Sequence, residues 1–250
     1  MLLSLKCEFL KLKRKHTLFI LLAGVFVQMI WCMGAMFSGS TDYTGSGYQI
    51  CLYQFPILNA LCFPVLIAIL VSNICDMEHK GNTHKQLFVM QEKGMFWNVK
   101  WIISLVYIFV MLLFQITSIY FIGKVLGFSD TFIIKEYALY FLSSIATSLF
   151  ISTLILTFAT LFKNQFIPFF MGITAGFLGF MSAFFPAWLM RIIPSSYYML
   201  LSTSGMNWDS TTRISTYYYR GFPILDFGVL LAILVICFYL SKAMFMRKGV

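Results

Sequence analysis

Six apolar stretches, each long enough to cross a lipid bilayer, occupy most of the 250 residues of this chain. A membrane-spanning helix needs about 20 predominantly apolar residues, because the hydrocarbon core is about 30 Å thick and a helix rises about 1.5 Å per residue. The stretches are residues 17–37, 50–73, 101–122, 137–162, 166–190 and 222–241. The sequence therefore predicts an all-α membrane protein with six transmembrane helices, in which residues 1–250 form a single transmembrane domain.

The composition agrees with this fold class. Hydrophobic residues make up 60% of the chain and charged residues only 11%, whereas about 25% of the residues of a soluble domain are charged. The first apolar stretch exceeds the core of about 7–15 residues that a cleaved signal peptide has, so we expect it to remain as a span. The six cysteines are scattered, and their spacing indicates neither a metal site nor a disulfide framework.

Positive charge is concentrated on one side of the predicted spans. That side carries residues 6–15, the connection 74–100, Lys163 and the end of the chain. The other side carries only Lys124, Lys135, Arg191, Arg213 and Arg220. The positive-inside rule therefore predicts that both termini are cytoplasmic, as an even number of spans also requires. The net charge of +9 reflects this bias and does not indicate a nucleic-acid partner.

The first sixteen residues have the pattern of an amphipathic helix lying in the membrane interface. Leu2, Leu5, Phe9 and Leu12 recur at helical spacing, and Lys13 must extend its side chain past this apolar side to reach water. The polar candidates of this interfacial helix are Glu8, Lys11, Lys13 and Arg14. The alternative is a disordered basic leader that serves only to orient the chain.

The connection between the second and third spans is the only sizeable one on the cytoplasmic side. Its candidate contact residues are Asp76, Glu78, His79, Lys80, Gly81, Thr83, His84, Lys85 and Leu87. Gly81 and Asn82 interrupt the chain, and Asn82 or Thr83 is a suitable cap for a short helix from His84 toward Gln91. A short helix of mixed charge suits docking to a soluble partner. Metal binding is the weaker alternative, because the acids and histidines match no established zinc spacing.

The spans themselves contain almost no charge, and Asp226 is the one acid that falls within them. Transporters driven by protons or sodium generally need ionisable residues or broken helices near the membrane midplane. The chain also has no phosphate-binding Gly-x-x-x-x-Gly-Lys-Ser/Thr loop. No constellation for hydrolysis is visible, since the histidines, at positions 16, 79 and 84, are all expected on the cytoplasmic side. The chain is thus not expected to be an enzyme, and energy for any transport comes from another subunit.

Small residues mark two candidate helix-packing surfaces. Ser144, Ser148 and Ser152 recur every four residues in the fourth span, and Gly172 and Gly176 form a Gly-x-x-x-Gly pair in the fifth. Such residues let helix backbones approach closely. Packing within this chain and packing against another subunit are equally compatible with the pattern, and the serines also suit the lining of a substrate path. The long outer segment 191–221 predicts a shallow helix or a re-entrant hairpin before the last span.

These features together resemble the permease subunits of type-2 ABC exporters. The sequence Glu8-Phe9-Leu10-Lys11-Leu12-Lys13-Arg14 before the first span resembles the start of those permeases, and the loop from Asp76 through Leu87 resembles their first cytoplasmic loop. The layout of the whole chain is similar as well. Within the family, the chain is most similar to the lantibiotic immunity permeases of Gram-positive bacteria.

The resemblance implies a role for each of these segments. Residues 1–15 would be the interfacial connecting helix, residues 76–91 would hold a coupling helix received by an ATPase, and 191–221 would contain outer re-entrant helices. Lys163, Asn164 and Gln165 would form a second, very short coupling contact. His84 departs from the bulky residue expected after Thr83.

The resemblance also implies partners and a function. Such permeases work in the bacterial plasma membrane with an ATPase dimer, which holds the ATP and magnesium, and with a second permease subunit. They expel antimicrobial peptides from the membrane and so confer immunity. The alternatives are an exporter of another amphipathic cargo (a drug, lipid or polysaccharide) and a non-transporting membrane sensor subunit. No cofactor or metal is expected on this chain.

Overall fold

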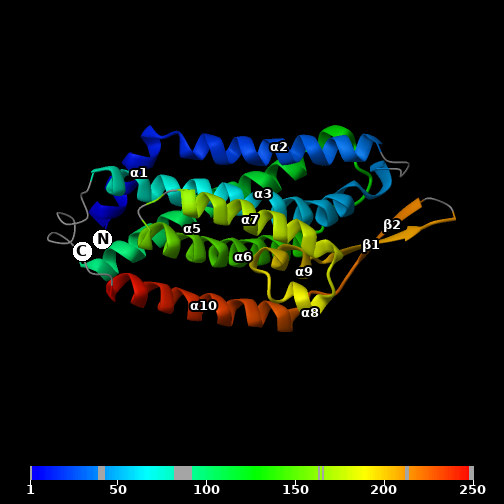
Figure 1. The fold of residues 1–250 in the computed structure, drawn as a ribbon. Helices are drawn as coiled ribbons and strands as arrows, with labels where there is room; N and C mark the ends of the chain where they lie inside the picture. The colour runs from blue at the N-terminus through cyan, green and yellow to red at the C-terminus, as the bar shows by residue number, and fades with distance from the viewer. Residues whose placement is uncertain are drawn as a thin grey trace.

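The computed structural model describes residues 2–38, 43–81, 92–162, 164, 166–211 and 214–247. The described residues form a bundle of long helices, with the two chain termini at one end and a β-hairpin projecting from the other (Figure 1). We call these the termini end and the hairpin end. Six helices are long and apolar enough to cross a membrane, which confirms the predicted all-α membrane fold.

The long helices extend further than the apolar stretches in several places. They are α1 (Leu2–Arg14), α2 (Thr17–Ser38), α3 (Tyr43–Gly81), α5 (Lys93–Leu126), α6 (Ile134–Leu161), α7 (Phe166–Met181) and α10 (Ile224–Arg247). The helix α3 has 39 residues and α5 has 34, because both continue past the apolar segment at their polar ends. Residues 1–16 are thus followed by six spans in the predicted order.

The fifth span ends earlier than residue 190, where the apolar stretch stops. The helix α7 ends at Met181 and is followed by a 3₁₀ turn, η1 (Ser182–Phe184). Phe185 is extended (φ −97°, ψ 151°) and Pro186 follows it. A proline disfavours the helical conformation of the residue before it, so the chain breaks here and restarts as a separate helix, α8 (Ala187–Met190).

The glycines of α7 pack against α3 of the same chain. A Cβ atom at Gly176 would lie 2.3 Å from the Leu61 carbonyl oxygen, and one at Gly172 would lie 2.4 Å from the Ala68 Cβ atom. The two backbones therefore approach as closely as only glycine permits. Figure 1 shows α7 running alongside α3 over most of its length.

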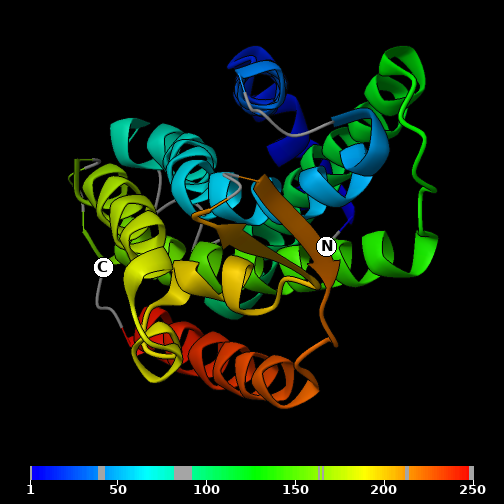
Figure 2. The same cartoon turned by 90° about the vertical axis from the view of Figure 1, so that its right-hand side faces the viewer.

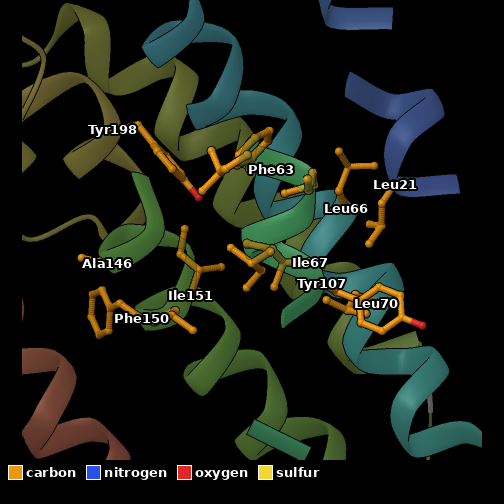
Figure 3. Packing of buried hydrophobic residues seen from close by; sticks show 14 of the residues in the cluster. Leu21, Phe63, Leu66, Ile67, Leu70, Tyr107, Ala146, Phe150, Ile151 and Tyr198 are labelled. Carbon is orange, nitrogen blue, oxygen red and sulfur yellow. The ribbon is translucent and has the colours of Figure 1, made fainter. Parts of the chain in front are cut away.

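The helix α6 is the most buried span and α10 the least. All of Ser144, Ser148 and Ser152 are buried inside this bundle. The Ser148 hydroxyl lies 2.7 Å from the Tyr198 hydroxyl, whereas Ser152 Oγ has no partner among the described residues. The apolar core lies between α2, α3, α5 and α6, as Figure 3 shows for part of it. The helices α2 and α10 lie on opposite sides of the bundle (Figure 2).

The segment between α7 and α10 consists of several short elements. They are α8, the 3₁₀ turn η2 (Pro194–Ser196), α9 (Tyr197–Leu200), and the antiparallel strands β1 (Ser204–Asp209) and β2 (Ile214–Tyr219). Tyr197 and Tyr198 are buried, so α9 is part of the core and not a surface loop. Arg191 ties this region to α10, because its Nε atom lies 2.7 Å from Asp226 Oδ1. The hydrogen bond to Asp226 raises the pKa of Arg191.

Proline positions in α3 connect this segment to the bundle. Proline has no N–H, so the carbonyl four residues before it loses its usual helical partner. The Leu52 carbonyl, four residues before Pro56, instead accepts a hydrogen bond from the Ser202 hydroxyl at 3.5 Å. The Ser204 hydroxyl donates to the Gln49 carbonyl at 3.3 Å. The root of the β-hairpin is therefore fastened directly to the start of α3.

Candidate functional site

The last turns of α3 are fastened to the turn that joins α1 to α2. Lys15, in the turn between α1 and α2, places its Nζ atom 2.8 Å from Asp76 Oδ2 and 3.2 Å from the Asn73 carbonyl oxygen. The Asn73 side chain in turn donates to the Thr17 hydroxyl at 3.3 Å. Asp76 is thus held by an ion pair that is largely shielded from solvent.

A buried lysine holds the same segment from the other side. Lys100 of α5 is 1% exposed, and its Nζ atom donates to the Ile74 carbonyl at 2.9 Å. The ammonium group also lies 4.6 Å from the centre of the Phe96 ring, a favourable position for a cation. In the sequence, Lys100 is only one of the positive charges on the predicted cytoplasmic side of the spans. Nothing in the local pattern distinguishes it from an exposed lysine.

We call these contacts of Lys15 and Lys100 with the end of α3 the joint. The predicted coupling loop begins directly beyond it. Glu78, His79, Lys80 and Gly81 lie in the final turn of α3, although their side chains lie outside the described part of the structure. Thr83, His84, Lys85 and Leu87 lie outside the described residues altogether, as do Lys163 and Gln165. Asn164 is exposed, and its side-chain oxygen accepts the Phe166 N–H at 3.0 Å, which caps the start of α7.

The predicted interfacial helix, α1, makes an ion pair within itself and a ring contact with α5. Glu8 is buried and makes an ion pair with Lys11, one turn later in α1. Lys13 and Arg14 are exposed. The Phe9 ring stacks on Tyr107 of α5 with their centres 6.0 Å apart, so α1 is packed against the bundle as well as tied to α3.

An open hollow of about 700 Å³ adjoins the joint at the termini end. It lies between the start of α5 and the end of α10, and it is lined by Glu92, Lys93, Gly94, Asn98, Lys242 and Met246. Its lining combines both signs of charge with apolar side chains. Such a surface suits contact with a protein partner better than binding of a small apolar molecule.

A second buried polar group lies inside the bundle, within the spans, and we call it the amide cluster. Its members are Gln28 of α2, Asn59 of α3, Gln115 of α5 and Tyr140 of α6, and all four are buried. Gln115 Nε2 donates to Gln28 Oε1 and to Asn59 Oδ1, each at 2.9 Å. Gln115 Oε1 accepts from the Tyr140 hydroxyl at 2.7 Å and from Asn59 Nδ2 at 3.3 Å.

The amide cluster joins four helices at one depth. Gln28 completes it by donating to the Leu58 carbonyl at 3.3 Å, and Asn59 Nδ2 also lies 2.6 Å from the Tyr140 hydroxyl. Polar side chains inside a membrane protein either bond helices together or line a path for polar groups. Because the members bond to one another, the cluster acts here as a fastening between helices. The sequence carries a signal for this cluster, because its three amide residues lie well inside apolar stretches. That signal does not enter the predictions made above from the sequence.

The ion pair at the joint gives a direct test of how α1 supports α3. We expect Lys15→Met to lower the free energy of unfolding by about 1–2 kcal/mol, because partly shielded ion pairs fall between exposed and fully buried ones. Equilibrium unfolding of the purified protein in SDS and dodecyl maltoside measures this change. The control is Lys13→Met, which removes an exposed charge from the same segment. Equal effects of the two substitutions would show that the ion pair contributes nothing specific.

Among the described residues, no group of three histidines, cysteines or acids is close enough to hold a metal ion. The described cysteines, Cys32, Cys51, Cys62, Cys75 and Cys237, form no disulfide. Two of the polar groups described here bond helices to one another: the joint at the termini end and the amide cluster within the bundle. Both are suited to transmitting movement along helices.

Comparison with protein families gives one match. Residues 4–182, more than half of the chain, match the family described as "ABC-2 family transporter protein". The matched region runs from α1 to the 3₁₀ turn after α7 and includes both the joint and the amide cluster. No curated protein shows a significant match to the chain.

Proposed function

Because this chain belongs to the ABC-2 family of transporter proteins, which form the membrane component of a transporter and not its ATPase, we propose that it expels lantibiotic-type antimicrobial peptides. The proposed assembly contains a separate ATPase dimer, which binds ATP and magnesium, and a second permease subunit. The termini end would face the cytoplasm and the hairpin end the outside, in keeping with the distribution of lysine and arginine.

The observation that carries the transport mechanism is the continuity of α3 after its non-helical residue Ser46. This helix starts beside the β-hairpin and runs to Gly81, where the proposed coupling loop begins. It is held at the termini end by Lys15 and Lys100 and at the hairpin end by Ser202 and Ser204. A displacement of its last turn would therefore be transmitted to the hairpin rather than lost in a flexible connection.

The proposed cycle follows from this arrangement. Nucleotide binding would bring the two ATPase subunits together, and their closure would press on residues 76–91 and on the contact at Lys163, Asn164 and Gln165. The push would move α3 together with α1 and α5, which are bonded to it near Asp76 and Ile74. The hairpin end would change shape in response, as in other hinge and shear movements.

The peptide cargo is supported by the similarity of the chain, among the permeases of type-2 ABC exporters, to the lantibiotic immunity permeases. Peptides of this class partition into the membrane, and a permease whose spans carry almost no charge suits cargo that enters from the lipid phase. Another amphipathic cargo would use the same coupling, so the choice of cargo needs a measurement in cells. A sensor subunit would need no coupling to ATP hydrolysis.

Deletion of the gene is expected to sensitise cells to at least one lantibiotic by several-fold, because peptide would no longer leave the membrane. The minimal inhibitory concentrations of a peptide panel measure this, with complementation by the wild-type gene as the control. A chain paired with a hydrolysis-deficient ATPase should fail to complement. Unchanged sensitivity across the panel would reject the lantibiotic cargo, and protection that persists without ATP hydrolysis would favour the sensor.

Purification from native membranes tests the proposed assembly separately. The chain should copurify with an ATPase subunit, and Glu78→Gln or His84→Ala should reduce the amount recovered. Glu136→Gln, at the opposite end of the bundle, is the matched control and should leave recovery unchanged. A chain that purifies without any nucleotide-binding partner would contradict the permease assembly whatever its cargo.

A further inference from the structure

A second hollow, of about 470 Å³, opens at the hairpin end. It lies where α5 ends beside the start of α3, two segments that can be followed in Figure 2. The residues of its lining that matter here are Tyr48, Tyr120, Lys124, Asp130 and Phe132. It lies on the opposite end of the spans from the coupling joint, and neither the joint nor the amide cluster contributes to it.

The walls of this hollow are fixed by close packing. Gly127 ends α5 in the left-handed conformation (φ 69°), which turns the following residues back toward α3. The Tyr48 ring covers Gly123 so closely that a Cβ atom there would lie 2.4 Å from the ring. The Tyr48 ring centre lies 5.3 Å from that of Phe132, and the Tyr120 and Phe132 centres are 5.4 Å apart. The aromatic wall is therefore built before any ligand arrives.

Asp130 is held in this wall by the backbone of α3. Its Oδ2 atom accepts the Gln49 N–H at 3.2 Å, and the N–H groups of Gly47 and Tyr48 also face the carboxyl group. These donors belong to the first turn of α3 after the non-helical residue Ser46. Asp130 thus closes the N-terminal end of the helix, and its position does not depend on a ligand.

The second oxygen of this carboxyl group is left without a partner. Asp130 Oδ1 is buried and accepts no hydrogen bond from any described residue. Burial raises the pKa of Asp130, although the backbone N–H groups act in the opposite direction. Asp130 Oδ1 itself has no surface toward the hollow, but the residue as a whole is partly exposed and lines it. A ligand there meets the charge of this carboxylate among aromatic rings, and a primary ammonium group, a cation with hydrogen-bond donors, is suited to that place.

Lys124 supplies the opposite charge on the rim of the hollow. Its Nζ atom lies 5.7 Å from the centre of the Tyr120 ring, and the residue is exposed. A ligand that carries only a positive charge would be repelled by this ammonium group. A zwitterion that places an anionic group at Lys124 and an ammonium group at Asp130 matches both charges.

An exposed apolar stripe on α5 leads to the hollow along the span. Phe121 and Val125, one helical turn apart, are 60% and 84% exposed; Leu113, two turns before Phe121 and separated from it by the exposed Thr117, is 43% exposed. An acyl chain can lie along this stripe while the headgroup of the same molecule reaches the hollow. The stripe distinguishes a membrane lipid from a soluble zwitterion as the source of the ligand.

We propose that this hollow binds the headgroup of an aminophospholipid, with the ammonium group at Asp130 between the aromatic rings and the phosphate at Lys124. Such a site is separate from the cargo proposed above and does not depend on it. A lipid seated there would contact the end of α5 and the first turn of α3, the helix that connects the two ends of the molecule.

Native mass spectrometry of the purified permease tests the site. Phosphatidylethanolamine and phosphatidylglycerol with the same acyl chains are supplied in equal amounts, and the lipid retained on the protein is counted. The wild type should retain several-fold more phosphatidylethanolamine. Asp130→Asn keeps an oxygen that accepts the Gln49 N–H but removes the charge, so this preference should disappear. Lys124→Gln should lower the retention of both lipids several-fold.

Two controls keep the result interpretable. Lys135→Gln removes an exposed lysine at the same end of the bundle and should leave retention unchanged. The melting temperature of each variant shows whether it is folded, independently of lipid binding and of any transport activity. An Asp130→Asn protein that is folded and still prefers phosphatidylethanolamine would overturn the proposal. Displacement of the lipid by a soluble lysine-containing peptide, unaffected by Lys124→Gln, would also overturn it in favour of a peptide site.

Discussion

Replacement of Gly176 by valine is expected to prevent most of the protein from reaching its folded state. The Cβ atom alone would lie 2.3 Å from the Leu61 carbonyl oxygen, which belongs to the backbone of α3 and cannot rotate away. The helix α7 would have to move off α3, and its contacts around Gly172 and Gly179 would be lost with it. The yield of monodisperse protein after size-exclusion chromatography in mild detergent measures the effect, and we expect a loss of about tenfold or more.

The matched control is Gly228→Val in α10. Gly228 is also a helical glycine, but no atom lies within 4 Å of the position that its Cβ would occupy. The cost to helix propensity is the same at both positions, so the difference between the two variants isolates the packing of α7 on α3. A Gly176→Val protein as well behaved as the Gly228→Val protein would mean that the two helices do not approach this closely.

Gln115→Leu is expected to cause the second large effect, because Gln115 bonds to every other member of the amide cluster. Its loss leaves Gln28 Oε1 and Asn59 Oδ1 buried without their donor. A buried polar group without a partner costs about 1–3 kcal/mol, although hydrogen bonds between membrane helices average nearer 0.6 kcal/mol. We therefore expect the free energy of unfolding to fall by about 2–4 kcal/mol. Equilibrium unfolding in mixed micelles measures it.

Thr117→Val provides the comparison for Gln115→Leu. Thr117 lies two residues away on α5, is exposed, and its hydroxyl donates to the Leu113 carbonyl of its own helix. Removing its hydroxyl group should change stability by less than about 0.5 kcal/mol. Gln28→Leu should fall between the two, since it releases α2 alone from the cluster. The interpretation of the cluster as a fastening fails if Gln115→Leu is no more destabilising than Thr117→Val.

The spans could be predicted from the sequence because their signal is local. Each is a run of apolar residues whose length matches the bilayer, so no knowledge of neighbouring helices is needed. The early end of α7 was not predicted, because Phe185 and Pro186 lie within a run that remains apolar to Met190. The β-hairpin was not predicted either, although the sequence Ile214-Ser215-Thr216-Tyr217-Tyr218-Tyr219 is rich in strand-forming residues. Aromatic residues in an outer segment are also typical of anchoring at the membrane interface, so their presence alone does not indicate a strand.

Most of the polar contacts depend on tertiary pairing that a single sequence does not reveal. Asp76 was a predicted contact residue, but its partner Lys15 is 61 positions away. Gln28 and Gln115 are separated by 87 positions, and no local pattern relates them. In the sequence, Lys100 resembles any other lysine at the end of a span. Only the structure shows that its ammonium group donates to the Ile74 carbonyl. Residues outside the described part of the chain, including His84, remain predictions.

The attachment of the β-hairpin to α3 has a consequence for how the protein is made. The bonds from Ser202 to Leu52 and from Ser204 to Gln49 join residues that are 150 and 155 positions apart. During translation, α3 enters the membrane long before these serines are synthesised. In that interval the Leu52 carbonyl lacks the hydrogen bond that Ser202 later provides. Nascent chains released before Ser204 should therefore be the preferred substrates of membrane quality-control proteases, and slower translation of the last quarter of the message should lengthen this vulnerable interval.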